Sequence, residues 1–336
     1  MAVVGLSRKR RIVKQFFILI CVFLLGFISD RVLNTGFTSA TLFAPIRQIG
    51  YSYVSPLLYC RYPNTGNSKL ISSLYTELHG YTGETNAKGI TQNVSVYFHD
   101  PTNGEWMSVN GSDQYAIASL VKVPLFMMLY QQSETNPNLL AKKLRFDGSV
   151  DDAVQNFKPP QQDVLHQGQS YTVDDLISRM IMYSDNNAMD ILTSQIKLDQ
   201  FNGHLKRLDF SPIQGNSQDD INMTVGKYAT FFRVLYNATY LDPAMSEKAL
   251  KLLTKTTFDS GIVAGVPKNI QVAHKFGERA YDNNMTKELH DCGIVYYPKH
   301  PYILCVMTKG NDFNQLASVI QTISLDTYNA VNASYH

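Results

Sequence analysis

The order in which strand-like and helix-like segments follow one another most constrains the fold of this chain. Apolar and polar residues alternate at Val94–His99 and Glu105–Val109, which predicts two strands joined by the turn sequence Asp100–Gly104. Helical spacing then dominates, until strand patterns return at Gln271–Phe276, Gly293–Tyr297 and Tyr302–Met307. Strands from both ends of a chain pack most simply as one antiparallel sheet, with the helices inserted between them.

Apolar residues at helical spacing predict seven helices, at Lys69–His79, Leu176–Met182, Asn187–Gln195, Gln200–Leu208, Val225–Leu235, Ser246–Thr254 and Phe313–Tyr328. Thr172 begins a capping-box variant, and Thr224 is placed to cap the helix that follows it. We therefore predict an α/β (α+β) fold. An antiparallel sheet of about five strands is flanked by helices, with an all-helical subdomain at about residues 117–257.

The N-terminal segment predicts a membrane anchor. Residues 1–14 carry basic and no acidic side chains, and Phe16–Ile28 is an unbroken apolar run that approaches the roughly 20 residues needed to span a bilayer. Basic residues keep that end in the cytoplasm, so the remainder would be exported. The predicted organisation is a cytoplasmic basic tail, a transmembrane anchor, a tether and a folded domain, at 1–11, 12–29, 30–66 and 67–336. A cleaved signal peptide is the alternative.

Charge and ligand spacing argue against several other classes of protein. The net charge is +2, and the chain beyond its N-terminal basic cluster is slightly acidic, so we expect no nucleic-acid partner. No Cys/His spacing fits a zinc site, and we expect no metal, no organic cofactor and a monomer. Cys292 and Cys305 flank a predicted hairpin turn at 298–301, which leaves open both a disulfide and two buried thiols.

Ser119 and Lys122 are the first candidates for chemistry. They lie three residues apart in the apolar run Tyr115–Tyr130, which we expect to be helical, so they would face the same side. A lysine in apolar surroundings can lose its proton and become the base that activates a serine. The spacing alone is a weak signal, because Ser194 and Lys197 repeat it, and a capping serine with a solvated lysine would explain either pair.

Two further motifs strengthen the signal. Ser184–Asn186 lies in a tight connector between two predicted helices, and Lys275–Gly277 ends a predicted strand. Separately, a helix cap and an edge-strand lysine would explain them. Combined with Ser119 and Lys122 in this order, they resemble the signature set of the class A β-lactamases and penicillin-binding proteins. The resemblance covers about residues 66–334.

The resemblance implies a role for each residue. Ser119 would be the nucleophile that becomes acylated, Lys122 would take or relay its proton, and Ser184 would pass a proton to the leaving nitrogen. The substrate would be bound by Asn186, Lys275, Gly277 and Glu278. Of these, Asn186 would hold a side-chain amide and Lys275 would add positive potential. Gly277 would let the substrate lie against the strand, and the N–H groups of Ser119 and Glu278 would form an oxyanion hole.

Three departures from the family pattern concern the substrate and the second half of the reaction. Phe276 stands where the family carries a hydroxyl that bonds a substrate carboxylate, so carboxylate recognition would fall to Lys275 and Arg279. Cys292 replaces an arginine that serves the same end. Residues 205–224 contain no glutamate to activate the deacylating water, although Asp209, Asp219 and Asp220 are present.

Three functions follow as hypotheses. The first is an exported, membrane-anchored β-lactamase-like serine hydrolase that attacks a β-lactam or a related cyclic or D-amino-acid amide. The second is a penicillin-binding D,D-peptidase that acts on peptidoglycan peptides, which the missing glutamate favours. The third is a non-catalytic relative that binds the cell wall, which the joint presence of Ser119, Lys122 and Ser184 argues against.

Overall fold

The computed structural model describes residues 46–59, 68–148, 164–212, 221–281 and 285–335. The predicted basic tail and membrane anchor, residues 1–11 and 12–29, lie outside them. Within these ranges, no helix combines the length and the apolar character that crossing a bilayer requires.

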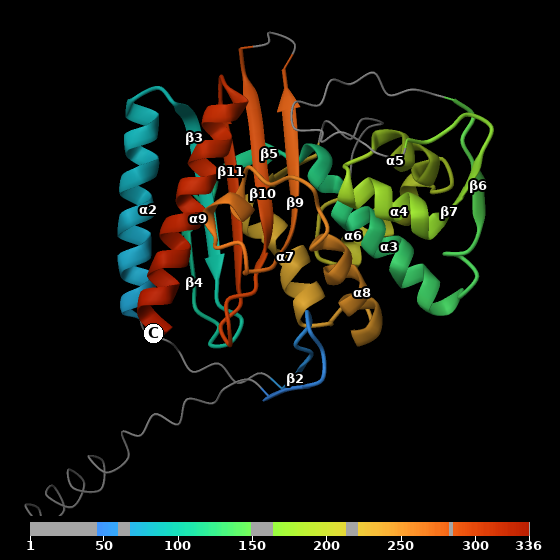
Figure 1. Ribbon diagram of the computed structural model, residues 1–336, viewed down its shortest axis with the longest axis horizontal. Helices are drawn as coiled ribbons and strands as arrows, with labels where there is room; N and C mark the ends of the chain where they lie inside the picture. Colours follow the sequence, from blue (N-terminus) through green and yellow to red (C-terminus); the bar gives the residue numbers. More distant parts are fainter. Residues whose placement is uncertain (1–45, 60–67, 149–163, 213–220, 282–284, 336) are drawn as a thin grey trace, which may run out of the picture. The chain divides into compact units, whose positions relative to one another are not determined.

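One five-stranded antiparallel sheet forms the centre of the fold, in the order β4-β3-β11-β10-β9 (Figure 1). Its strands are β3 (Thr91–His99), β4 (Trp106–Val109), β9 (Val272–Ala280), β10 (Lys287–Val295) and β11 (Tyr302–Gly310). The first two strands and the last three come from opposite ends of the folded region, and β11 pairs with β3 to join them. The prediction of a sheet built from both ends is confirmed.

Helices cover both faces of this sheet. On one side, α2 (Lys69–Ala87) packs with α9 (Phe313–Tyr335), and on the other α7 (Val225–Tyr236) contacts β3, β10 and β11 (Figure 1). The remaining long helices lie between β5 and β9 in the chain, as predicted. They are α3 (Lys122–Thr135), α4 (Val173–Met182), α5 (Asn186–Thr193), α6 (Leu198–Arg207) and α8 (Pro243–Leu253).

Strand periodicity divides the apolar residues between two cores. Val94, Val96 and Phe98 of β3 enter the core beneath α2 and α9. In β11, Leu304 and Val306 enter that core, while Ile303, Cys305 and Met307 belong to the core shared with the helical subdomain. Because β11 is buried on both faces, its sequence is a continuous apolar run rather than an alternating one.

The structure corrects the prediction of one helix across Tyr115–Tyr130. The segment begins as strand β5 (Gln114–Ala116), which pairs with β8 (Asn222–Thr224), passes through the 3₁₀ turn η1 (Ala118–Val121) and only then enters α3. Ala118 has a φ of 46°, a left-handed value that no α-helix contains. The apolar spacing was therefore correct for burial but wrong for backbone conformation before Lys122.

Several other boundaries differ. Helix α2 runs eight residues past the predicted His79, through Gly80 and Gly83, because Leu78, Thr82 and Thr85 continue its buried face. The short pair β6 (Lys143–Arg145) and β7 (Ser170–Thr172) was not predicted. Glycine lowers helix propensity, but burial against the sheet outweighs that cost of about 1 kcal/mol per residue.

Part of the predicted tether is packed against the domain. Residues 46–59 hold β1 (Ile46–Arg47) and β2 (Leu57–Tyr59), which pair with each other. Glu247 of α8 accepts hydrogen bonds from three consecutive backbone N–H groups at 52–54, over 2.8 to 2.9 Å. The carboxylate therefore fixes this loop at the start of α8.

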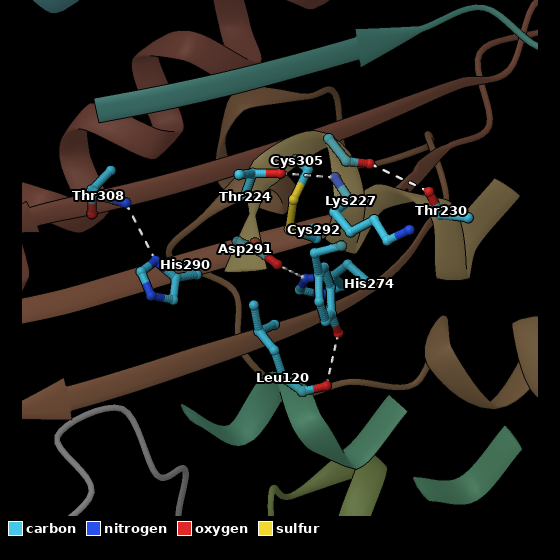
Figure 2. The surroundings of a disulfide bond; sticks show 12 residues. Leu120, Thr224, Lys227, Thr230, His274, His290, Asp291, Cys292, Cys305 and Thr308 are labelled. Carbon is cyan, nitrogen blue, oxygen red and sulfur yellow. Dashed lines mark hydrogen bonds and ion pairs between the residues drawn. A yellow bond between two sulfur atoms is a disulfide. The ribbon is translucent and has the colours of Figure 1, made fainter. Parts of the chain in front are cut away.

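Cys292 and Cys305 form a disulfide, the first of the two states that the sequence left open. They are directly opposite each other in the ladder between β10 and β11, with their Cα atoms 4.0 Å apart, and both are fully buried (Figure 2). On its other side, Cys292 is opposite Lys275 of β9. The disulfide and Lys275 thus share one face of the sheet.

Loss of the Thr172 cap tests how the helical subdomain is held. The Thr172 hydroxyl accepts a hydrogen bond from Asp175 N at 3.1 Å, as the capping motif predicts. Thr172→Ala should lower the free energy of unfolding by about 1 kcal/mol in chemical denaturation. Thr76→Ala, on the exposed face of α2, is the control and should change it by less than about 0.5 kcal/mol. Equal effects would show that the cap contributes nothing.

Candidate active site

Ser119 lies in the 3₁₀ turn η1, and Lys122 follows that turn as the first residue of α3. Residues three apart eclipse each other in a 3₁₀ helix, and the Lys122 ammonium donates to Ser119 Oγ at 3.1 Å. Tyr228 of α7 fixes this turn, because its hydroxyl donates a hydrogen bond to Leu120 O at 2.8 Å. The predicted pairing of the two side chains therefore holds, on a tighter helix than expected.

The Lys122 ammonium is the centre of the site. Besides Ser119, it contacts Ser184 O at 2.8 Å, Ser184 Oγ at 3.1 Å and Asn186 Oδ1 at 2.5 Å. Lys122 is only 1% exposed although it begins a helix. A buried lysine requires such partners, so these oxygens explain how the site tolerates it.

The connector between α4 and α5 brings Ser184 and Asn186 to this lysine. Asp185 caps α5 by accepting a hydrogen bond from Ala188 N at 3.1 Å. Ser184 itself has a φ of 55°, a left-handed conformation that costs roughly 1–3 kcal/mol in a non-glycine residue. The connector therefore does act as a helix cap, and it also aims two polar side chains at Lys122.

Lys275 of β9 completes the cluster. Its ammonium donates to Ser184 Oγ at 3.0 Å and to Phe276 O at 3.1 Å, and the side chain is fully buried. Burial, and then the neighbouring charge of Lys122, hold the pKa of Lys275 well below its ordinary value, while Asp291 and Glu278 act in the opposite direction. Two amines thus meet at one serine hydroxyl, and their repulsion favours release of a proton from the pair.

Gly277 allows β9 to touch the Ser119 turn. A Cβ atom at this position would lie 2.9 Å from Ile117 O and 3.1 Å from Leu120 N, closer than side chains pack. The structure shows close backbone packing of Gly277 against η1, which sets Glu278 of β9 beside the turn that carries Ser119. Room for a substrate at Gly277 stays a prediction.

The second Ser-x-x-Lys pair does not form a site. Ser194 ends α5 and its hydroxyl donates to Ile191 O at 2.8 Å, while Lys197 is an exposed residue before α6. The capping serine and solvated lysine expected of an isolated match are what the structure contains. Only the pair at 119 and 122 meets Ser184 and Lys275.

Glu288 and His290 of β10 are positioning residues that the sequence analysis missed. Glu288 Oε2 accepts from Ala116 N, and His290 Nε2 lies against Ala116 O, both at 3.0 Å. His290 Nδ1 accepts from Thr308 N, which leaves the proton on Nε2 to donate to Ala116. These side chains bind both backbone groups of a residue three before Ser119. In the sequence, these residues could have been noticed as two ionisable side chains at alternate positions of one strand, which places both on the same face of the sheet.

The described residues offer no metal site, since no three His, Cys, Asp or Glu side chains gather there. Of the three aspartates in the loop after α6, only Asp209 falls in a described range. It is fully exposed and pairs with Lys227 at 3.0 Å. This carboxylate is therefore occupied by an ion pair on the surface.

Removal of the Glu288 carboxylate tests the clamp on Ala116. Glu288→Leu leaves the buried Ala116 N–H without its acceptor, which should cost about 1–3 kcal/mol of stability and speed hydrogen exchange of that amide. Lys309→Gln is the control, because Lys309 approaches Glu288 Oε1 at 3.6 Å without touching Ala116. An unchanged exchange rate at Ala116 in Glu288→Leu would refute the clamp.

The buried Lys275 should make stability depend on pH. Between its lowered pKa and the ordinary value of 10.5, the unfolded chain binds a proton that the folded site releases, so wild-type stability rises with pH across that window. Lys275→Met removes this contribution. We expect denaturation curves to show the variant gaining most over wild type at neutral pH, with the gain shrinking towards pH 10.5. Parallel pH profiles would contradict the shift, and Lys309→Met is the matched control.

Comparison with known proteins places this geometry in a family. The model of the β-lactamase enzyme family matches residues 84–331, which is most of the chain. The β-lactamase VEB-1 of Pseudomonas aeruginosa is 21% identical over 220 residues, or 61% of this chain and 73% of VEB-1.

Solved structures repeat the fold. A class A β-lactamase from Bacteroides cellulosilyticus is 16% identical, with a TM-score of 0.68 over 80% of this chain and 100% of its own. PBP-A is 18% identical, with a TM-score of 0.64 over 78% of this chain and 97% of its own. The similarity to these solved structures shows the fold, and the match to the family model shows that the chain is a member of the family. The chain belongs to the β-lactamase enzyme family, whose members are serine hydrolases with this α+β architecture.

Proposed function

We propose that the protein is an exported, membrane-anchored serine hydrolase that attacks a β-lactam, or a related cyclic or D-amino-acid amide, through an acyl-serine intermediate. One observation carries the proposal. The Lys122 ammonium contacts both Ser119 Oγ and Ser184 Oγ, so a nucleophile and a proton donor share one base.

The contacts support a balanced acylation step. Neutral Lys122 takes the proton as Ser119 Oγ bonds to the substrate carbonyl carbon. The carbon–nitrogen bond then breaks, and the leaving nitrogen takes a proton from Ser184, which Lys122 or Lys275 replaces. Asn186 would bind the substrate's side-chain amide. The N–H groups of Ser119 and Glu278, on segments that Gly277 brings into contact, would stabilise the oxyanion.

A second candidate is a D,D-peptidase that acts on peptidoglycan peptides. Residues 205–224 lack a glutamate, and Asp209 is exposed and paired with Lys227 rather than buried as a general base. Loss of a positioned base typically slows a step by about 10²–10⁴-fold. Slow deacylation would suit an enzyme whose acyl group passes to a cell-wall acceptor, and a β-lactam would then trap it.

Two features of the chain support export and anchoring, its N-terminal sequence and its disulfide. Basic residues precede the apolar run Phe16–Ile28, which fits a signal anchor with a cytoplasmic N-terminus. The disulfide between Cys292 and Cys305 is consistent with an oxidising compartment outside the cytoplasm.

Intact-protein mass spectrometry after brief exposure to benzylpenicillin tests the nucleophile. We expect a covalent adduct in the wild type and none in Ser119→Ala, because no other atom would be acylated. Ser194→Ala, in the motif that forms no site, is the matched control and should be labelled at the wild-type rate. Labelling of Ser119→Ala would refute the assignment.

The time course of the same adduct separates the two candidates. Rapid loss of the adduct with hydrolysed product would support the β-lactamase-like activity. An adduct that persists would support the peptidase.

A further inference from the structure

Lys275 has no hydrogen-bonding capacity left for a substrate. Its three N–H donors face three acceptors: Ser184 Oγ at 3.0 Å, Phe276 O at 3.1 Å and the face of the Phe276 ring, whose centroid lies 4.2 Å from Nζ. The residue is fully buried, and Ser184, the Phe276 carbonyl and the Phe276 ring are the groups that contact its ammonium. A carboxylate could reach this amine only by displacing one of the three.

Packing fixes the ring in that position. Phe276 is 1% exposed and stacks on Phe258, with centroids 4.3 Å apart and planes at 22°. Phe258 is itself buried in the core beneath α9. A rotation of the Phe276 ring away from Lys275 would therefore break this stack and open a cavity, which makes the ring a fixed cover.

The charge needed to attract a carboxylate is reduced as well. Burial and Lys122 lower the pKa of Lys275, and the position beside Lys275 on the next strand is Cys292, tied to Cys305 and fully buried. Arg279, further along β9, stacks its guanidinium on Tyr281 at 4.7 Å. Lys275 is thus flanked by a disulfide on its own face of the sheet and by the Phe276 ring, which belongs to the core on the other face.

We propose that Phe276 is a specificity-determining residue, and that the site acylates neutral amides or esters, which carry no carboxylate next to the scissile bond. The proposal rests on the proposed function and names its substrate class. The step itself is unchanged: Ser119 Oγ bonds to the carbonyl carbon, the bond to the leaving group opens, and the leaving atom receives the proton that Oγ lost. What Phe276 decides is which leaving group can lie beside Lys275.

Benzylpenicillin and its methyl ester test the proposal, because they share one reactive ring and differ only in the carboxylate. The measurement is the second-order rate constant for formation of the Ser119 adduct, followed by intact-protein mass spectrometry. For the wild type, we expect the ester to react at least as fast as the acid. An acid that reacts tenfold or more faster than the ester would overturn the proposal, and loss of that preference in Arg279→Gln would assign the carboxylate to Arg279 instead.

Substitution of the ring should change the ratio of the two rate constants. Phe276→Thr uncovers Lys275 and adds a hydroxyl donor, so the acid should gain about tenfold or more over the ester, as a charge-assisted hydrogen bond typically provides. Phe276→Leu is the matched control, since it removes the ring without adding a donor and should gain less. A ratio unchanged in a folded Phe276→Thr protein would also overturn the proposal.

Adduct formation by the wild type distinguishes failure of the acyl-serine function from failure of the role of Phe276. If neither the acid nor the ester forms an adduct with the wild type, the acyl-serine function fails and the specificity fails with it. If the acid reacts much faster than the ester, the function stands and only the role of Phe276 is lost. The wild-type comparison needs no variant to fold.

Discussion

The burial of one lysine ammonium is the constraint on which the site depends. Lys122 lies in an apolar core, where an isolated charge would be very costly, and the oxygens around it come from η1 and from the α4–α5 connector. These segments must therefore meet for the lysine to be tolerated at all. The same contacts that offset its desolvation also place two hydroxyls within proton-transfer distance, so stability and reactivity share one set of hydrogen bonds.

The sheet and the helical subdomain each contribute residues that fix the site around Ser119 and Lys122. From the sheet, β9 brings Lys275 and packs through Gly277 on the turn of Ser119, while β10 binds the backbone of Ala116. From the helices, Tyr228 holds Leu120. Two residues near Lys122, Ala118 and Ser184, have a left-handed backbone conformation. Backbone strain of this kind persists only where the surrounding structure holds it. The nucleophile is thus fixed from two layers at once.

Much of the fold and of the site could be predicted because the signals are local. Period-two and helical spacing report burial, and caps such as Thr172 and Thr224 report helix starts, so the order of the five sheet strands and of the long helices was predicted correctly. The pairing of Ser119 with Lys122 is also local. What could not be predicted depends on contacts between distant residues, as in the clamp of Glu288 and His290 on Ala116, more than 170 positions away. The position of the Phe276 ring likewise depends on Phe258, whose role no pattern indicates.

The disulfide between β10 and β11 has a further consequence for strand alignment. Side chains alternate across a sheet, so a slip of one residue between these strands would carry one of the two sulfur atoms to the opposite face. The covalent link between Cys292 and Cys305 forbids that slip even in a partly unfolded chain. Cys292 is also opposite Lys275 of β9, so the strand that the disulfide aligns with β11 is the one with which β9 pairs. When the oxidised chain refolds, the disulfide therefore already holds β10 and β11 in their native register.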